Sequence, residues 1–600
     1  MKRFIVRLLI AAILWPSIAP LAWGTTYYVR DCGTGHEGSC TAGDDTKLGT
    51  SDANAWQNCS KVQAMITSAA SAPAGTQVLF AKGGAWDTCA IAPAGALAGA
   101  TSGSNPIVFG SFDPATGGTN VPILSNATAS VFRFVDSGNA DPDIGITIQD
   151  LHLKGAAGNG TPGIIFGNDV DYITLQRLEI ELFDIGVQIT SAQTNALNTG
   201  TDGIISHVTL RDSNIHNNYS QGWLGFADDV LIENNTFTNN GGKSTTSDHQ
   251  IYADGSTLLG APRTAKQFVV RGNTFTDNNS YRTSDGLFTA GRCASVAIIT
   301  HGHGDGFIVR DNIVKETSPS TNSGCWGIAV DAGYNITSSG IKDPEGYNFA
   351  DVSGNHVINY DVGIGLDICQ HCRAVNNWVY SAAAASKNPD GMRMRMQYNQ
   401  FGTTNGDITS DRDFYPHYVE MSNNSVYLAD AGTTSVGIRW THNSGEAASL
   451  WALLGSNHVN ANNLIVLLGS SVSTTTQCFN FDNITASRFA FSDNNQCYST
   501  AAVKWTDTRS LATWRSDSGL DGSSITTDPS ITTPSSGNAF SLAIPTGSTA
   551  KNAGSNTHCQ TLSIFGRVRS TADASCDIGA YEFGASTDAA PQPPTRITVQ

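Results

Sequence analysis

Val230-Leu-Ile-Glu-Asn-Asn235 is a short apolar, β-branched run that ends in an asparagine-containing turn, and close copies of it recur along the chain. The preceding copy ends at Ser213, 22 residues earlier, and a later pair ends at Asn355 and Asn377, again 22 residues apart. A unit of about 22 residues, lengthened elsewhere by inserted loops, accounts for every copy. The others are Phe268-Val-Val-Arg-Gly-Asn273, Phe307-Ile-Val-Arg-Asp-Asn312 and those that end at Asn424, Asn463 and Asn494.

A second sequence motif accompanies the first and has the pattern glycine, apolar, any residue, apolar. This alternation has a period of two, which is typical of a strand with one buried face. Each unit therefore contains two or three short strands separated by turns. Examples are Gly163-Ile-Ile-Phe166, Gly186-Val-Gln-Ile189, Gly327-Ile-Ala-Val330, Gly363-Ile-Gly-Leu366, Gly391-Met-Arg-Met394 and Gly437-Ile-Arg-Trp440.

Such units predict an all-β fold, a parallel β-helix. One unit cannot bury its apolar face alone, whereas stacked units form a continuous core and pair their backbone groups with their neighbours. Asparagine suits the turns because it tolerates left-handed backbone and bonds to nearby backbone groups, and stacked asparagines can also bond to one another. A propeller would need units of about 40 residues, which the 22-residue spacing opposes.

Composition excludes several classes of protein. Only 14% of the 600 residues are charged, and 51 acidic residues against 34 basic ones give a net charge of −17. Binding to nucleic acid through phosphate contacts requires an excess of lysine and arginine, so we expect no nucleic-acid partner. The chain is 40% hydrophobic, which opposes intrinsic disorder.

Residues 1–24 read as a secretory signal. Lys2, Arg3 and Arg7 precede an apolar stretch, and small residues at Ala22 and Gly24 suit cleavage before Thr25. An uncleaved anchor is the alternative. We therefore expect a secreted protein, extracellular or periplasmic, with no membrane span in the mature chain, and we expect a monomer.

All 12 cysteines follow the leader, and an oxidising destination favours disulfides. The local pairs expected are Cys32 with Cys40, Cys478 with Cys497, and Cys559 with Cys576. Cys369-Gln-His-Cys372 has the spacing of half a zinc site, but no second ligand pair follows it, so a disulfide or buried thiols are the alternatives.

The chain resembles the secreted bacterial right-handed parallel β-helix (pectin-lyase-like) proteins over residues 25–583. Its end, with Asn552-Ala-Gly554 and Cys576-Asp-Ile-Gly-Ala-Tyr-Glu-Phe583, is similar to the closing signature of the choice-of-anchor family Q, although an aspartate usually stands where Asn552 lies. Tyr27-Tyr-Val29 and Gly84-Ala-Trp86 are similar to the N-terminal caps of such proteins, with a helix expected within 61–70. Residues 25–130 would then be cap and first turns, 131–500 the solenoid, 501–583 the closing segment and 584–600 a loose tail.

The strand register predicts one outward-facing row of polar side chains. Asp331 and Asp367 would lie about 5 Å apart on adjacent units, and a third unit would carry Arg393 and Arg395. Two close carboxylates favour either a shared proton, hence a general acid, or a bound calcium ion. Nearby on the same face we expect the catalytic candidates His249, Tyr252, Asp254 and Asp285, and the substrate-binding candidates Arg282, Phe288, Arg292 and Trp326.

We expect long inserted loops beside this row of polar side chains, where they would form the sides of a groove. They lie at 236–248, 255–267, 274–284 and 291–306. Between 240 and 315 the chain has eight basic and six acidic residues, which suits an anionic polysaccharide.

The fold resemblance implies a carbohydrate-active protein that acts on an extracellular, uronate-containing polysaccharide by a lyase- or epimerase-type proton abstraction. By that analogy His249 or Tyr252 would be the acid or base, Arg282 and Arg393 would neutralise the uronate, and the aspartates would hold calcium or tune pKa values. The alternatives are a non-catalytic surface, adhesin or polysaccharide-binding protein, and a glycoside hydrolase. Gly302-His303-Gly304 and Asp228-Asp229 resemble the polygalacturonase pattern, but its other motifs are missing.

Overall fold

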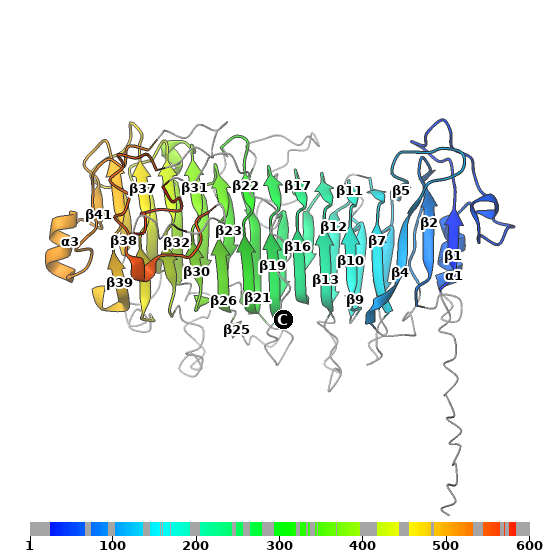
Figure 1. Cartoon of the computed structure of the whole chain (residues 1–600), viewed down its shortest axis with the longest axis horizontal. Coiled ribbons are helices and arrows are strands. Elements are labelled where there is room, and N and C mark those ends of the chain that lie inside the picture. Colours follow the sequence, from blue (N-terminus) through cyan, green and yellow to red (C-terminus); the bar gives the residue numbers. More distant parts are fainter. Residues whose placement is uncertain are drawn as a thin grey trace, which may run out of the picture.

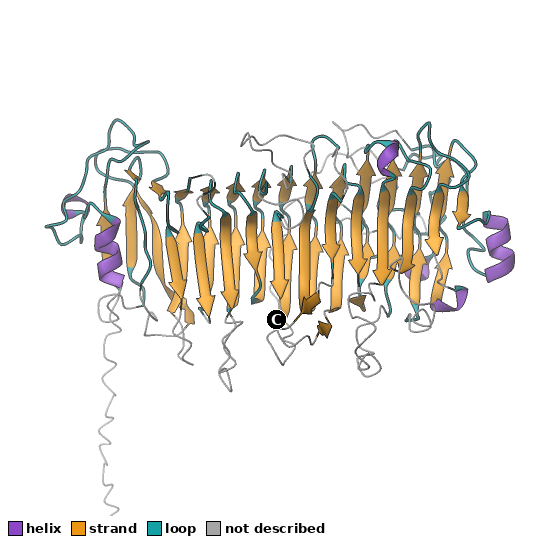
Figure 2. Cartoon of the chain, turned by 180° about the vertical axis from the view of Figure 1, so that it is seen from behind, coloured by secondary structure: helices purple, strands orange, loops and turns teal. Residues whose placement is uncertain are grey.

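The computed structural model is a long solenoid of three parallel β-sheets, a right-handed parallel β-helix (Figures 1 and 2). Each turn of chain, here called a rung, passes through sheet C, then sheet A, then sheet B. The described residues are 24–66, 74–93, 102–135, 144–156, 158, 160–168, 170–191, 205–242, 248–255, 265–278, 293–319, 324–331, 334–336, 342–344, 346–367, 369–396, 417–442, 455–481, 485–531, 544–564, 569 and 575–583.

Sheets A and C share one long strand, β21 (Val296–Arg310), which runs through both. The other strands of sheet A are β1 (Thr26–Val29), β2 (Gln77–Ala81), β4 (Ser102–Phe112), β7 (Ile144–Gln149), β10 (Ile173–Gln176), β13 (Ser206–Arg211), β16 (Asp228–Glu233), β19 (Ala265–Arg271), β26 (Gly346–Ser353), β29 (Cys369–Gln370), β30 (Arg373–Val375), β33 (Glu420–Ser422), β36 (His458–Ala461) and β39 (Phe489–Asp493). Those of sheet C are β6 (Phe132–Val135), β9 (Ile164–Asn168), β12 (Ile185–Ser191), β15 (Gln221–Gly225), β18 (Ile251–Gly255), β23 (Trp326–Val330), β28 (Val362–Asp367), β32 (Asp390–Met396), β35 (Val436–His442), β38 (Gln477–Phe481) and β41 (Lys504–Thr506).

Sheet B has the shortest strands, and a few elements lie outside the three sheets. Sheet B comprises β3 (Ala85–Trp86), β5 (Ile123–Ser125), β8 (His152–Lys154), β11 (Glu179–Glu181), β14 (Asn214–His216), β17 (Thr236–Thr238), β20 (Thr274–Thr276), β22 (Ile313–Lys315), β27 (His356–Ile358), β31 (Trp378–Ser381), β34 (Ser425–Leu428), β37 (Leu464–Leu467) and β40 (Gln496–Ser499). The remainder are the hairpin of β24 (Tyr334–Ile336) and β25 (Lys342–Pro344), helices α1 (Cys59–Ile66) and α3 (Leu511–Ser518), and 3₁₀ turns at Asp52–Asn54, Ala385–Lys387, Ala486–Arg488 and Asn556–His558.

An asparagine ladder lies at the turn between sheets A and B. The side-chain Nδ2 of Asn355 donates to Oδ1 of Asn377 at 3.0 Å, and Asn377 donates to Asn424 at 3.1 Å. Each of these amides also donates to a backbone carbonyl of an earlier rung, so the buried turn is fully bonded. The ladder confirms the repeat, with one correction. Its last copy uses Asn495, because Asn494 takes the left-handed position just before it.

The glycine that opens each sheet C strand is required by close packing between rungs. A Cβ on Gly363 would lie 2.4 Å from Val379 Cγ1 and 2.5 Å from the carbonyl oxygen of Gly391. Gly391 meets Val426 and Gly437 in the same way. The glycine that opens this sequence motif therefore marks the place where the chain turns tightly from sheet B to sheet C.

The two ends of the solenoid are covered by helices, as an open stack of strands requires. Helix α1 buries Val62 and Ile66 at the first end, inside the stretch where a capping helix is expected. Helix α3 buries Trp514 at the other end, where Trp514 Nε1 donates to Asp521 at 2.8 Å.

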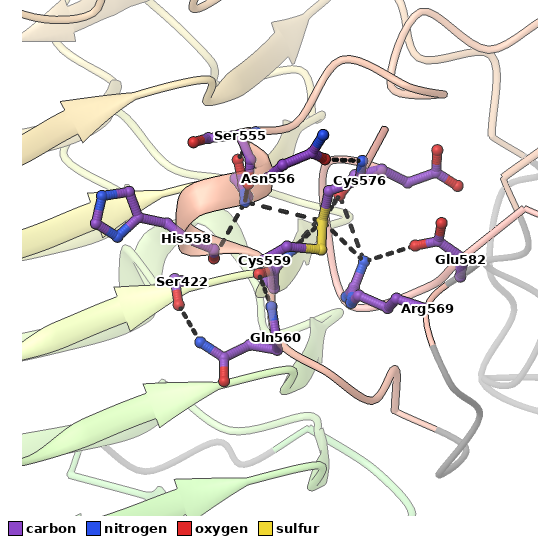
Figure 3. The surroundings of a disulfide bond; sticks show 12 residues. Ser422, Ser555, Asn556, His558, Cys559, Gln560, Arg569, Cys576 and Glu582 are labelled. Atoms are coloured by element: carbon purple, nitrogen blue, oxygen red, sulfur yellow. Dashed lines mark hydrogen bonds and ion pairs between the residues drawn. A yellow bond between two sulfur atoms is a disulfide. The ribbon is translucent and has the colours of Figure 1, made fainter. Parts of the chain in front are cut away.

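The chain then returns along sheet B as a closing strap, defined here as residues 544–583. Its apolar side chains Ile564, Ile578 and Tyr581 cover Trp378 and Tyr380 on the outer face of that sheet. Figure 3 shows the Cys559–Cys576 disulfide of the strap beside the buried pair of Arg569 and Glu582. This packing explains why sheet B carries large apolar side chains on both faces at these rungs.

All 12 cysteines form disulfides. The three predicted pairs, Cys32–Cys40, Cys478–Cys497 and Cys559–Cys576, are confirmed. Cys369 bonds to Cys372, so the half zinc site is excluded in favour of the disulfide. Two longer-range pairs, Cys59–Cys89 and Cys293–Cys325, were not predicted. Among the described residues, no helix has the length and hydropathy needed to cross a membrane.

Candidate functional site

The outer face of sheet C carries two adjacent rows of aligned side chains across β18, β21, β23, β28 and β32. One row contains Tyr252, Ile299, Ala329, Gly365 and Arg393 in register. The other contains Asp254, His301, Asp331, Asp367 and Arg395, with Asp331 bonded through its backbone N–H to Thr300. The predicted alignment of Tyr252, Asp331, Asp367, Arg393 and Arg395 on one face is therefore correct.

One rung of the prediction is wrong. We expected Asp285 and Phe288 to lie in the rung after Tyr252, but residues 296–301 form it, and Ile299 and His301 take the two outward positions. The stretch 291–306, expected as a loop, includes the start of β21 from Val296. Asp285 and Phe288 lie outside the described residues, as do Arg282 and Arg292.

Asp367 is the centre of the site. Its carboxylate is 1% exposed and accepts two hydrogen bonds from Arg395, at 3.1 Å to Nε and 2.7 Å to Nη2. Nη2 of Arg393 lies 3.7 Å away. Burial raises the pKa of Asp367 to about 6, and the two guanidinium groups oppose part of that rise.

Arg393 and Trp326 form a stacked pair beside this carboxylate. The guanidinium carbon of Arg393 lies 3.5 Å from the centre of the indole ring, and that of Arg395 lies 5.7 Å away. Burial lowers the pKa of Arg393 to about 10, while Asp367 acts in the opposite sense. Trp326 therefore holds Arg393 by a cation–π contact rather than standing free as a sugar platform.

Asp331 links the charged pair to a histidine. Its Oδ1 lies 4.0 Å from Nη2 of Arg395, and its Oδ2 lies 3.9 Å from Nε2 of His301. The His301 ring meets the edge of Tyr252 at 5.4 Å between centroids. Buried Tyr347 donates to the backbone oxygen of His301 at 2.9 Å and so fixes that strand. Tyr252, His301, Asp331 and Asp367 thus follow one another along this face, and Arg395 contacts both carboxylates.

His249 lies behind Tyr252, with 5.0 Å between the ring centroids. It is 3% exposed, and its Nδ1 lies 2.7 Å from the carbonyl oxygen of Val296. A carbonyl only accepts, so Nδ1 carries the proton and the lone pair of the neutral ring is on Nε2. Desolvation lowers the pKa of His249 to about 3. The ring is neutral at ordinary pH and supports Tyr252 from the interior.

The calcium site predicted at Asp331 and Asp367 does not fit the contacts found. Calcium takes six to eight oxygen ligands, whereas Asp367 faces two guanidinium groups whose positive charge repels a cation. Cys293, Cys325 and Glu316 also approach one another closely. Those two cysteines form a disulfide and have no thiolate to offer.

Two features of this face, a histidine and an ion pair, were not predicted from the sequence. His301 was not predicted because the rung was placed one segment too early in the sequence, although the β-branched pair Ile298-Ile299 before it is typical of a strand. The second is the pair of Asp390 with Arg439, whose Nε and Nη2 bond to the two carboxylate oxygens at 2.8 and 3.0 Å. Of Asp254, only its backbone position opposite His301 is described.

This arrangement has clear chemical capabilities. A carboxyl group with a pKa near 6 can hold or release a proton near neutral pH. Tyrosine and histidine side chains next to it can pass a proton, and two guanidinium groups can meet an anionic ligand. The side chains of Arg393, Arg395, Asp331 and His301 are only 13 to 22% exposed, so their neighbours cover most of their surface.

Comparison with known proteins gives distant structural similarity only. No family model matches the chain, and no curated protein matches its sequence.

Similar solved structures include an alginate lyase from Paenibacillus sp. str. FPU-7, which is 14% identical with a TM-score of 0.36 and covers 62% of this chain and 95% of its own. The A-module of a mannuronan C-5 epimerase from Azotobacter vinelandii is 14% identical with a TM-score of 0.35 and covers 78% and 95%. The tailspike protein of E. coli bacteriophage HK620, in complex with a pentasaccharide, is 13% identical with a TM-score of 0.39 and covers 76% of each chain. Similarity this low assigns no activity to the chain, and its own strand pairing establishes the parallel β-helix.

Proposed function

We propose that the protein is a secreted, carbohydrate-active β-helix that binds an anionic, uronate-containing polysaccharide along sheet C and transfers a proton at its C5. The observation that carries this proposal is the unbroken row from Tyr252 through His301 and Asp331 to the Asp367–Arg395 pair. It places proton-carrying groups and guanidinium groups on one face of sheet C. Six disulfides support an oxidising, extracellular destination, and the family Q signature at the C-terminus stays a prediction.

In this proposal the reaction is a β-elimination. A base removes the proton on C5 of the uronate, the electron pair forms a double bond between C4 and C5, and the C4–O bond breaks. The leaving oxygen takes a proton. Epimerisation would instead return a proton to C5 from the opposite face.

The residues divide into two roles. Tyr252 and His301 are assigned as the proton-transfer groups, because a phenol and an imidazole can each hold or release a proton. Arg395 would bind the uronate carboxylate by exchanging its weak 4.0 Å contact with Asp331 for a bidentate one. Asp367 holds Arg395 in place, and no metal step is included.

The test uses the full mature chain on a panel of uronate and neutral polysaccharides. Ultraviolet absorbance detects new unsaturated ends, reducing-end assays detect hydrolysis, and proton NMR detects epimerisation. Tyr252→Phe and Arg395→Met should each lower kcat/KM by at least about 100-fold. Arg373→Met is the matched control, because Arg373 forms a similar pair with Asp351 at 2.8 Å on sheet A. Equal activity of Arg395→Met and Arg373→Met would remove the site.

Binding without catalysis is the second candidate function. The two hydrogen bonds from Arg395 to Oδ2 of Asp367 favour it, since a catalytic carboxylate is more often kept free of so strong a partner. Polysaccharide binding that Arg395→Met abolishes, without any product in the three assays, would establish this function instead.

A further inference from the structure

The outer face of sheet B, two sheets away along the rung from the candidate site, carries a compact group of imidazoles and carboxylates. Strands β8, β11 and β14 are adjacent, with Glu179 in register with His152 and Glu181 in register with His216. The central residue of each strand, such as Ile180, points into the core, so the flanking residues point outward. Glu179 and Glu181 therefore lie side by side on the middle strand, with one histidine on each neighbouring strand.

Each imidazole contacts both carboxylates. His152 places Nε2 at 3.1 Å from Glu181 and Nδ1 at 3.7 Å from Glu179. His216 places Nε2 at 3.2 Å from Glu179 and Nδ1 at 4.0 Å from Glu181. The four residues thus form a closed ring in which histidine and glutamate alternate. Glu179 and Glu181 thus offer carboxylate oxygens, and His152 and His216 offer imidazole nitrogens.

The charge of this ring is not balanced when the imidazoles are neutral. Two carboxylates then face one cation, Lys154, whose Nζ lies 3.4 Å from Glu181. The lysine side chain is 44% exposed and free to turn into solvent. With neutral imidazoles, the form that binds a metal ion, the ring carries an excess of negative charge that a divalent cation would neutralise.

We propose that His152, Glu179, Glu181 and His216 form a binding site for a divalent transition metal of the zinc type. Two imidazole nitrogens and two carboxylate oxygens are a donor set that zinc accepts in tetrahedral geometry. The contacts of 3.1 and 3.2 Å made by the two Nε2 atoms approach the separation of neighbouring ligands around such an ion. Calcium and magnesium are disfavoured because they take oxygen ligands.

A second contact supports the assignment of His216 as a ligand. The side-chain Nδ2 of Asn217 lies 3.0 Å from Nδ1 of His216 and donates to it as placed, whereas a half turn of the amide brings Oδ1 there instead. With its oxygen turned to the ring, this amide would accept the Nδ1 proton, which leaves Nε2 to bind the metal. Such an outer contact usually accompanies a metal-bound imidazole. Among the described residues, no three donor atoms of this ring lie within 4.8 Å of one another, so binding requires the imidazole and carboxylate side chains to turn toward the centre of the ring.

The experiment is calorimetric titration of the purified full chain with zinc chloride after treatment with a chelator, alongside magnesium and calcium. The wild-type chain should bind one zinc ion at this ring, and its thermal midpoint should rise with zinc. Cobalt in place of zinc should give the visible absorption of a tetrahedral site.

His152→Ala, His216→Ala and the isosteric Glu181→Gln should each weaken zinc binding at least about tenfold. His207→Ala is the matched control, because His207 has a single carboxylate neighbour, Asp229 at 3.4 Å, and should leave binding unchanged. Circular dichroism without metal verifies that each variant is folded. Absence of zinc binding by the wild-type chain, or binding unaffected in a His152→Ala, Glu181→Gln double variant, would overturn the proposal.

Discussion

At the scale of single residues, Asp367 shows how the solenoid changes the chemistry of a side chain. An aspartate that ends a strand would ordinarily be solvated and ionised with a pKa of 3.8. Here the neighbouring rungs and the stack of Trp326 with Arg393 remove water from it. The same rungs supply two guanidinium groups, so the carboxyl group remains usable near pH 6.

This environment has a measurable effect on stability. Because burial raises the folded-state pKa of Asp367 from 3.8 to about 6, its contribution to the free energy of unfolding is fully present below about pH 4. That contribution is lost as the pH rises through 6, and a shift of this size corresponds to at most about 3 kcal/mol.

The comparison is between urea unfolding of the wild-type chain and of Asp367→Asn, measured from pH 4 to pH 8. The difference between the two free energies should change across that window, in the direction of lower wild-type stability at high pH. Two parallel curves would show that Asp367 titrates as an ordinary aspartate.

At the scale of elements, the sequence predicts the features that every rung repeats, but it does not predict the features in which the rungs differ. The strands, the asparagine turns and the glycine openings follow from local patterns, so the fold and the Asp331–Asp367–Arg395 alignment were predictable. The position of each rung along the axis of the solenoid was not predictable, because an insert of unknown length can place the next strand earlier or later in the sequence. The rung at 296–301 was misassigned for this reason. The Cys59–Cys89 disulfide, whose partners are 30 positions apart in the sequence, likewise depends on three-dimensional neighbours.

The glycine openings give a prediction for the element scale. Gly391→Ala would place a Cβ 2.3 Å from Val426 Cγ1 and 2.5 Å from the carbonyl oxygen of Gly437. Two rungs must separate to admit it, so the free energy of unfolding should fall by at least about 2 kcal/mol. Gly38→Ala is the control, because a Cβ there meets nothing within 4 Å. Equal denaturation midpoints for the two variants would contradict this account.

At the scale of the whole molecule, the closing strap determines what sheet B exposes. Arg569 joins distant parts of the chain, donating to Glu582 at 3.0 Å and to Asn376 at 2.9 Å. Together with the Cys559–Cys576 disulfide, it holds the strap over the aromatic face formed by Trp378, Tyr380 and Tyr427.

Removal of this disulfide should release the strap without unfolding the solenoid. A chain carrying Cys559→Ser and Cys576→Ser loses the constraint on a 17-residue separation, worth about 3 kcal/mol in the loop-closure description. We expect faster proteolysis within 544–583 and increased binding of an apolar dye. Substitution of Cys32 and Cys40 at the opposite end should not increase dye binding. A resistant strap in the first variant would mean that apolar packing alone holds it.

The asparagine ladder gives the solenoid a polarity. One N–H of every ladder amide from Asn235 to Asn495 donates to the next rung toward the C-terminal end, and that of the last one donates to the carboxyl group of Asp521. Asp521 also accepts from Ser524 and Trp514. The aligned amide dipoles add along the axis in the way that peptide dipoles add in an α-helix. The two ends are consequently not interchangeable, and the C-terminal end needs a terminator that accepts hydrogen bonds, which is the position Asp521 occupies.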